Sequence, residues 1–162
     1  MNKKYNFYKS DDQRIKELNI PNGYDFLWFK PKLLKLQLHG GSVVKYLLWY
    51  FFTLGRYKIL YIKNKKANKY AHWSNIMPKT WQYPFMSKQD KHIISCYTEP
   101  SDRGKGLYPF AIELARKKYS DIWIISEVNN IASNNGIIKT GFTFAGSGFK
   151  NSFKRYILNA RS

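Results

Sequence analysis

The sequence has only one cysteine, Cys96, and three histidines that lie far apart in the chain. One cysteine cannot form an internal disulfide, and these histidines do not show the spacing of metal ligands. The first residues, "MNKKYNFYKSDDQRIKEL", are polar and lack the apolar run of a signal peptide. We therefore expect a cytoplasmic protein that carries neither a structural disulfide nor a metal ion.

Acidic residues are also scarce, since 10 Asp and Glu stand against 28 Lys and Arg and give a formal net charge of +18. A charge of this sign attracts nucleic acid, anionic lipid or a phosphate-bearing small molecule, and by itself it does not choose among them. It disfavours a polycationic substrate such as a polyamine or an aminoglycoside, because the site for such a substrate needs carboxylates.

The chain has no linker rich in Pro, Gly and Ser, no internal repeat and no low-complexity segment. Its 162 residues, 44% of them hydrophobic, therefore suit a single domain. The mostly apolar run at 43–54 is too short to cross a bilayer, which takes about 20 residues. We expect a helix there, capped by Ser42 and ended at Gly55, that packs on a sheet or on a partner chain. Contact with a membrane surface and self-association are the alternatives for this helix.

Apolar periodicity predicts several strands in the first hundred residues. They cover residues 4–9, 24–31, 57–64, 69–77 and 91–98. The turn at 65–68 is expected to join its two neighbouring strands into an antiparallel hairpin. A short polar helix is expected from about Ser10 or Asp11 onward.

The predicted strand at 91–98 has no strongly polar face, which favours a central place in the sheet. Strict alternation places its side chains in two sets. The first set is His92, Ile94, Cys96 and Thr98, and the second is Ile93, Ser95 and Tyr97. We interpret His72, His92 and Cys96 as packed or surface residues rather than catalytic ones.

A helix is expected next, because Leu107, Phe110 and Leu114 recur at helical spacing. Pro109 is tolerated only in the first turn of a helix, so this helix should begin near Gly106. The remaining predicted elements are a strand at 121–128 parallel to the strand at 91–98, a short helix at 131–139 and a hairpin at 142–158. This order of elements predicts a mixed sheet in an α/β or α+β fold.

The turn "PSDRGKGLYP", residues 100–109, lies between the predicted strand and the predicted helix. Gly104 and Gly106 let an anion approach the backbone N–H groups, and Arg103 and Lys105 add positive charge. These features predict a cradle for a phosphate or pyrophosphate, although a plain surface loop is the alternative. The spacing matches neither a P-loop nor the GxGxxG motif of dinucleotide-binding proteins.

Two blocks of the sequence resemble the signatures of the GNAT N-acetyltransferase superfamily. The first block is Arg103-Gly104-Lys105-Gly106-Leu107-Tyr108, in which Tyr108 replaces the usual small residue, and the second is Asn130, Ser133, Lys139, Gly141 and Phe142. The resemblance covers about residues 56–158. It implies a GNAT-like mixed central sheet, flanked by helices, in which two parallel strands splay apart. It also implies one acetyltransferase domain with an acetyl-CoA-binding core at 56–158 and a variable acceptor-side region at 1–55.

The resemblance further implies acetyl-CoA as the acyl donor. The backbone of the glycine turn would hold the pyrophosphate, and these residues are Arg103, Gly104, Lys105, Gly106, Leu107 and Tyr108. The strand end at Tyr97, Thr98 and Glu99 would pair with the pantetheine arm. Asn130 and Ser133 would contact the same arm from the next helix.

The chemistry implied by the resemblance is direct attack of an amine on a thioester, which needs a base, donors for an oxyanion and an acid for the thiolate. Glu127 stands where ribosomal-protein acetyltransferases carry their base, and Glu99 is the second candidate. A solvated carboxylate at a strand end is the alternative reading of Glu127. The position that often holds the tyrosine acid is Ile137 here. Tyr97, Tyr108, Tyr156 or a solvent proton would have to replace it.

The acceptor is expected to be a small-molecule amine. The block "YTEPSDRGKGLYP" resembles bacterial members that act in surface-polysaccharide synthesis, so we expect a nucleotide-linked amino sugar. A peptide or protein amine is the alternative acceptor.

Two other classes of function compete with the enzyme. One is a catalytically silent acyl-CoA sensor. The other is a nucleic-acid-binding protein, whose bases would stack on aromatic side chains. The candidates for stacking are Tyr57, Tyr61, Tyr70, Trp73, Trp81 and Tyr83. We do not expect nucleic acid as a partner, because the two signature blocks favour a coenzyme A site.

Overall fold

A computed structural model describes residues 3–10, 19–35 and 42–159 of the chain. The described strands are β1 Lys4–Ser10, β2 Tyr24–Phe29, β3 Lys58–Asn64, β4 Lys69–Pro78, β5 Lys91–Thr98, β6 Ile122–Glu127, β7 Phe142–Lys150 and β8 Tyr156–Leu158. The described α-helices are α1 Val43–Thr53, α2 Leu107–Lys118 and α3 Ile131–Lys139. The short helix expected after Ser10 falls on residues 11–18, outside the described residues.

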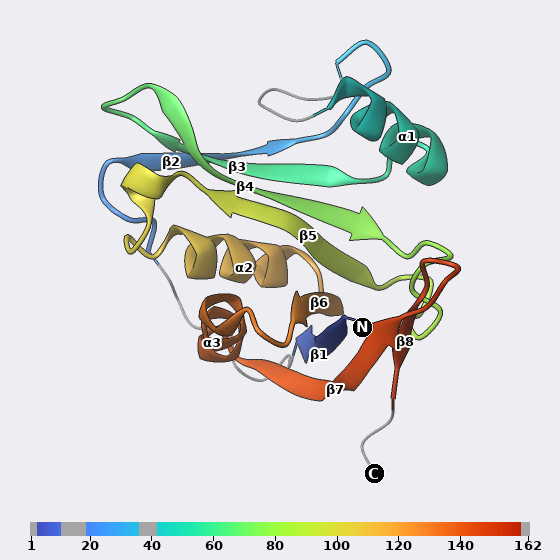
Figure 1. The fold of residues 1–162 in the computed structure, drawn as a ribbon. Coiled ribbons are helices and arrows are strands. Elements are labelled where there is room, and N and C mark those ends of the chain that lie inside the picture. Colours follow the sequence, from blue (N-terminus) through green and yellow to red (C-terminus); the bar gives the residue numbers. More distant parts are fainter. Residues whose placement is uncertain (1–2, 11–18, 36–41, 160–162) are drawn as a thin grey trace.

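The strands form one mixed sheet of eight in the order β2-β3-β4-β5-β6-β1-β7-β8 (Figure 1). β5 and β6 are the parallel pair, and the other strand pairs of the described sheet are antiparallel. β1 lies between β6 and β7, so the start of the chain completes the middle of the sheet. The predicted hairpin of β3 and β4 and the central position of β5 are confirmed.

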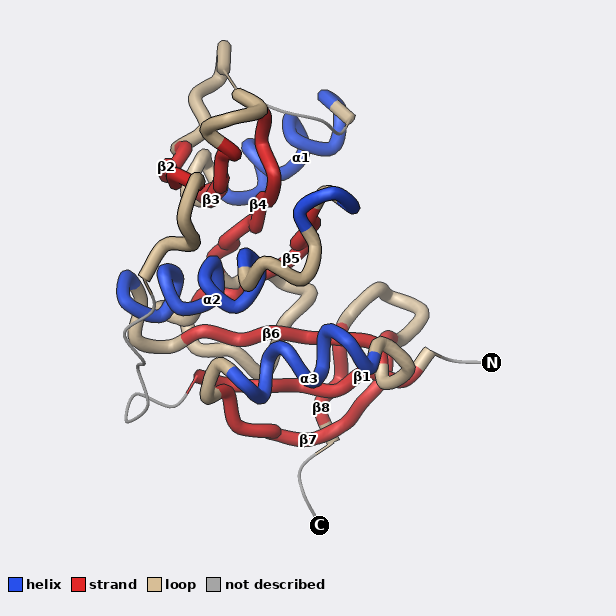
Figure 2. The backbone as a smooth tube through the Cα atoms, turned by 90° about the vertical axis from the view of Figure 1, so that its left-hand side faces the viewer, coloured by secondary structure: helices blue, strands red, loops and turns tan. Residues whose placement is uncertain are grey.

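The helices cover opposite faces of this sheet. α2 and α3 lie over one face, where buried Leu60 and Ile62 of β3 join the larger core. α1 lies on the other face, where Ile59 and Tyr61 of the same strand join a second core. This division follows from the alternation of side chains along a strand. Figure 2 shows α1 beside β2, β3 and β4, apart from α2 and α3.

α1 differs from an ordinary surface helix because it is apolar on both sides. Tyr46 and Thr53 are buried against the sheet, whereas Leu48, Phe51 and Phe52 are more than half exposed. The helix has 11 residues. Among the described helices, none has both the length and the apolar character needed to span a membrane.

A buried ion pair fastens α2 to the end of α3. The Arg116 guanidinium donates to the Glu113 carboxylate over 2.9 Å, and both side chains are 2% exposed. The same guanidinium donates to the backbone carbonyl of Thr140, directly after α3. The pair therefore fixes the position of α3 over the sheet.

The predicted alternation of side chains along β5 is wrong beyond Ile94. Ser95 has a φ of +50°, and Trp73 of β4 faces Tyr97 while Asn75 faces Ile94. β5 thus carries one extra residue in a β-bulge. Cys96 consequently packs with the core under α2 and α3, on the opposite face from Ile94, which packs with the core under α1.

Candidate active site

The parallel strands β5 and β6 separate soon after they begin. They pair at three positions, of which the last joins Ile93 to Ile124. The bulge at Ser95 follows directly in β5, and a bulge bends its strand and leaves backbone groups unpaired. The splay implied by the resemblance is therefore confirmed, and it opens a gap in the centre of the sheet.

A cavity of about 290 Å³ lies at this gap, and we call it the splay cleft. Its lining residues come from the end of β5, the glycine turn, the first turn of α2 and the start of α3. They are Cys96, Tyr97, Thr98, Arg103, Tyr108, Asn130, Ala132 and Ser133. Six of these residues were expected from the sequence to hold acetyl-CoA, so the fold brings them together, and their role in binding stays a prediction.

The glycine turn places open backbone at the mouth of the splay cleft. Gly104 and Gly106 have φ values of +75° and +74°, which side chains rarely tolerate, and an added Cβ would meet nothing within 4 Å. The first hydrogen bond of α2 runs from the Phe110 N–H to the Gly106 carbonyl over 3.1 Å. The N–H groups of Leu107 and Tyr108 thus have no acceptor inside the helix. An anion fits here, at the positive end of α2.

The Asp102 carboxylate holds this turn in shape. It accepts from the Tyr24 hydroxyl at 2.5 Å, from Lys105 Nζ at 3.0 Å and from Asn64 Nδ2 at 3.1 Å. These hydrogen bonds, with the Tyr24 hydroxyl as the strongest, lower the pKa of Asp102 to about 2. The Lys105 side chain is therefore directed to Asp102, and the Leu107 side chain is buried in the core. Both residues offer their backbone to the cleft, as the resemblance implied.

Replacing Asp102 by Asn should cost about 2 kcal/mol of unfolding free energy at pH 7, because the pKa falls from the ordinary 3.8 to about 2 on folding. A lowered pKa stabilises the fold above the unfolded value, so this advantage is lost as the pH drops from about 4 to about 2. Urea unfolding of the unchanged protein and of the variant across this pH range measures the difference in unfolding free energy. Asp121→Asn is the control, since its exposed pair with Lys9 should contribute less than about 1 kcal/mol. An equal loss in both variants would contradict the assignment.

Polar contacts order the walls of the splay cleft. Arg103 Nε donates to the Thr98 carbonyl over 3.2 Å, which folds the turn back onto the end of β5. The Asn130 Oδ1 accepts from the Ser133 N–H at 3.1 Å and caps α3. Burial raises the pKa of Tyr108, whose hydroxyl lies 3.3 Å from Ser133 Oγ. Tyr108 therefore keeps its proton and bridges the two helices across the cleft.

The three tyrosines that could replace Ile137 as an acid occupy different places. Ile137 itself is fully buried in the core. Tyr97 stacks on Trp73, at 4.6 Å between the rings, and Tyr156 stacks on Tyr83 near the opposite face of the sheet. Tyr97 and Tyr108 both line the splay cleft, and the Tyr108 hydroxyl lies beside Ser133 in its wall.

The two candidate bases point to different sides of the molecule. Glu127 shares a face of β6 with Trp123 and Ile125, opposite α2 and α3, and its carboxylate pairs with Lys3 Nζ at 2.7 Å. Glu99 instead lines a separate cavity beside the β3–β4 hairpin, together with Asp102. Neither carboxylate is among the described residues that line the splay cleft or the inner chamber. Glu127 shares its strand face with Ile125 of the inner chamber, and its catalytic role stays a prediction.

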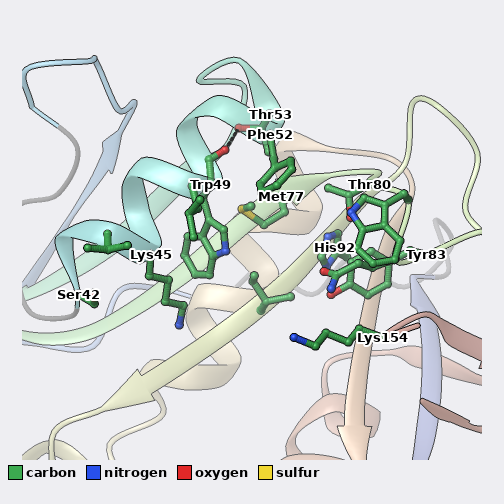
Figure 3. A pocket seen from close by; sticks show the side chains of 15 residues that line it. Ser42, Lys45, Trp49, Phe52, Thr53, Met77, Thr80, Tyr83, His92 and Lys154 are labelled. Carbon is green, nitrogen blue, oxygen red and sulfur yellow. Dashed lines mark hydrogen bonds between the residues drawn. The ribbon is translucent and has the colours of Figure 1, made fainter. Parts of the chain in front are cut away.

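Two neighbouring cavities with shared lining residues lie on the α1 face of the sheet. The α1 pocket, about 520 Å³, is enclosed by α1, the segment between β4 and β5, and Lys154 of the β7–β8 turn (Figure 3). The inner chamber, about 310 Å³, adjoins it and reaches Ser95 and Ile125, where β5 and β6 separate. The residues common to both are Lys45, Trp49, Gln82, Tyr83, His92 and Ile94. The inner chamber and the splay cleft therefore approach the gap from opposite faces.

His92 and His72 are both buried, as the sequence suggested, but only one has its polar atoms satisfied. The ring of His72 lies 2.7 Å from Thr98 Oγ1 and 2.7 Å from Ser74 Oγ. His92 is 2% exposed, and its ring faces the backbone carbonyl of Pro78 without a well-formed hydrogen bond, while both ring nitrogens are shielded from the cavities. Sequence reasoning missed the place of His92 in the wall of two cavities, which depends on contacts between distant segments.

The sequence finds no match among protein-family models or curated proteins. Its structure resembles a GNAT-family acetyltransferase from Colwellia psychrerythraea, at a TM-score of 0.63, 15% identity, 88% of this chain and 53% of that one. A GCN5-related N-acetyltransferase from Sphaerobacter thermophilus gives a TM-score of 0.59, 11% identity and coverages of 90% and 50%. A conserved protein of unknown function from Staphylococcus epidermidis gives a TM-score of 0.64, 10% identity and coverages of 91% and 60%.

These similarities define the fold of the chain, which is that of the GNAT acetyltransferases. The predicted fold class, a mixed sheet with splayed parallel strands and flanking helices, is thereby confirmed. The chain spans about half to three fifths of the length of the solved structures that it resembles. Its activity, substrates and partners are therefore taken up as proposals.

Proposed function

We propose that the protein is an acetyl-CoA-dependent N-acetyltransferase whose acceptor is a nucleotide-linked amino sugar. The observation that carries the proposal is the ending of the β5–β6 pairing at Ile93 and Ile124, with the glycine turn at the mouth of the gap. The donor would enter the splay cleft from this side. The acceptor would enter the inner chamber from the opposite face.

The reaction supported by this arrangement transfers an acetyl group from sulfur to nitrogen. Acetyl-CoA supplies the thioester when it is bound. Glu127, on the acceptor face, would take a proton from the substrate ammonium, and backbone N–H groups freed by the bulge at Ser95 would donate to the carbonyl oxygen. As the C–N bond forms and the C–S bond breaks, the Tyr108 hydroxyl would donate to the leaving sulfur. The nitrogen loses two protons in all: the one taken by Glu127 passes to solvent, and the one released as the C–N bond forms replaces, through solvent, the proton that Tyr108 gives to sulfur. The products are an N-acetyl amide and coenzyme A.

The aromatic residues give little support to the alternative of a nucleic-acid-binding surface. Tyr57, Tyr61 and Tyr83 are buried and offer no free ring for base stacking, and Trp81 is the one exposed ring of the six candidates. The phosphate cradle and the splay cleft have no role in that function.

Calorimetric titration with acetyl-CoA tests the proposal directly. We expect saturable binding that free coenzyme A competes, followed by release of thiol when nucleotide-linked amino sugars are added. Binding without turnover on amino sugars, peptides or protein amines would favour an acyl-CoA sensor instead. No binding by the folded protein would refute the acetyltransferase, and nucleic-acid affinity that falls steeply with salt would then replace it.

A further inference from the structure

The walls of the α1 pocket and the inner chamber carry positive charge and no negative charge. Lys45 Nζ lies 4.6 Å from the centre of the Trp49 ring, and Lys154 extends from the β7–β8 turn into the same space (Figure 3). No Asp or Glu is among the described residues that line either cavity. Between Asp25 and Asp90 the sequence itself has twelve Lys and Arg and no acidic residue. These cavities therefore attract anions and repel polycations.

The outer part of the α1 pocket is apolar and open to solvent. Leu48, Phe52 and Trp81 line it, with 51%, 70% and 51% of their surfaces exposed. Met77 and Trp49 continue this apolar wall inward. Exposed apolar side chains around a concave site are typical of a surface that a ligand covers. The ligand thus needs a flat or apolar group as well as an anionic one.

His92 forms a neutral part of the inner wall. Its imidazole lies against Tyr83, with 4.0 Å between the ring centres, and borders both cavities. Burial lowers its pKa to about 3, so the ring is neutral at pH 7. Both ring nitrogens are shielded from the cavities, and the ring faces the backbone carbonyl of Pro78. The ring therefore adds no charge to the site, and Lys45 and Lys154 supply the charge of its walls.

We propose that these two cavities form one binding site for an anionic amine that also carries a flat apolar group. The apolar group lies along Leu48, Phe52 and Trp81, and the anion lies between Lys45 and Lys154. The amine extends past His92 into the inner chamber, toward Ser95 and Ile125. A nucleotide-linked amino sugar belongs to this class through its base and its phosphates. The fate of the amine rests on the proposed function, whereas the binding itself does not.

Ligand-detected NMR without acetyl-CoA tests the site with four probes. They are 4-(2-aminoethyl)phenyl phosphate, tyramine, 2-aminoethyl phosphate and spermidine. We expect the aryl phosphate to bind at least about tenfold more tightly than each of the others, since tyramine lacks the anion, aminoethyl phosphate lacks the ring and spermidine is a polycation. Equal or tighter binding of spermidine or of 2-aminoethyl phosphate would overturn the proposal.

Exposed lysines give the matched variants. Lys45→Gln with Lys154→Gln should weaken the aryl phosphate by at least about tenfold and leave tyramine unchanged. Lys117→Gln, on the exposed side of α2, should change neither affinity. If the double variant bound both probes more weakly, or bound both as tightly as the unchanged protein, the assigned place of the anion would be contradicted.

His92→Phe tests whether this ring is only a wall of the site, because Phe keeps a ring against Tyr83 and removes both nitrogens. It should leave the affinities of 4-(2-aminoethyl)phenyl phosphate and of phenyl phosphate unchanged within about twofold, since neither nitrogen is open to the cavities. A selective loss of the probe that carries the amine would contradict the assigned place of the amine.

Three further outcomes separate this proposal from the proposed function. Competition of the aryl phosphate by excess coenzyme A would place the probe at the glycine turn and overturn the site. Binding of the aryl phosphate without competition and without any turnover would support the site and count against acetyl transfer. Binding of acetyl-CoA with no binding of the aryl phosphate would refute this site alone.

Discussion

Replacing Gly106 by Trp is expected to abolish the binding of acetyl-CoA while the protein stays folded. Gly106 is the N-cap of α2, with a φ of +74°, and the direction of its missing Cβ is open. An indole there would occupy the space in which the pyrophosphate approaches the N–H groups of Leu107 and Tyr108. Calorimetric titration should show at least about a hundredfold loss of affinity, which corresponds to about 2.7 kcal/mol.

The control for this variant is Gly23→Trp. Gly23 also has a positive φ, +83°, with nothing within 4 Å of an added Cβ, so the same side chain meets the same backbone strain at another turn. It should bind acetyl-CoA like the unchanged protein, and circular dichroism should show that both variants fold. Undiminished binding by the Gly106 variant would remove the glycine turn from the cofactor site.

Sequence patterns predicted the strands, the helix and the turn around the proposed donor side, because each of these elements is determined by residues close together in the chain. The apolar alternation of β3 and β4, the helical spacing after Gly106 and the glycine turn each act within a few residues. The separation of β5 from β6 was predicted only because two sequence blocks resemble the GNAT signatures. No pattern of apolar residues specifies where two paired strands stop pairing.

The bulge at Ser95 could not be read from β5 alone. Strict alternation is the default for a strand, and the extra residue becomes visible only when β5 is aligned with β4. The same limit applies to Asp102, for which the sequence analysis assigned no role. Its partners Tyr24 and Asn64 come from β2 and β3, and the sequence does not show that these residues meet.

The acceptor side of the molecule was the least predictable part. α1 was expected as a helix because of its apolar run, and the structure confirms it, but its exposed face joins a pocket with Trp81 and Lys154 from distant segments. The sequence alone treated His92 as a packed residue. Burial is correct for His92, and its place in the wall of two cavities becomes visible only when the contacts between distant segments are known.

Replacing Glu127 by Gln should lower kcat by about a hundredfold and leave the affinity for acetyl-CoA unchanged. The Glu127 side chain lies on the same face of β6 as Ile125, which lines the inner chamber. This face of the strand points away from α2 and α3. Gln keeps the shape and the polarity of the side chain but cannot accept a proton. Steady-state kinetics with a nucleotide-linked amino sugar, beside an acetyl-CoA titration of the same variant, measures both quantities.

Two variants separate the loss of a base from the loss of an ion pair. Lys3→Gln removes the partner of Glu127 and keeps the carboxylate, and since the pair is solvent-exposed its loss should leave kcat within about twofold. Glu99→Gln should also be silent, because Glu99 lines the cavity beside the β3–β4 hairpin. If Lys3→Gln and Glu127→Gln reduced kcat equally, the ion pair would be structural. If neither variant reduced kcat, the proton would leave the amine by another route, and the inner chamber beside His92 would be the place to look for it.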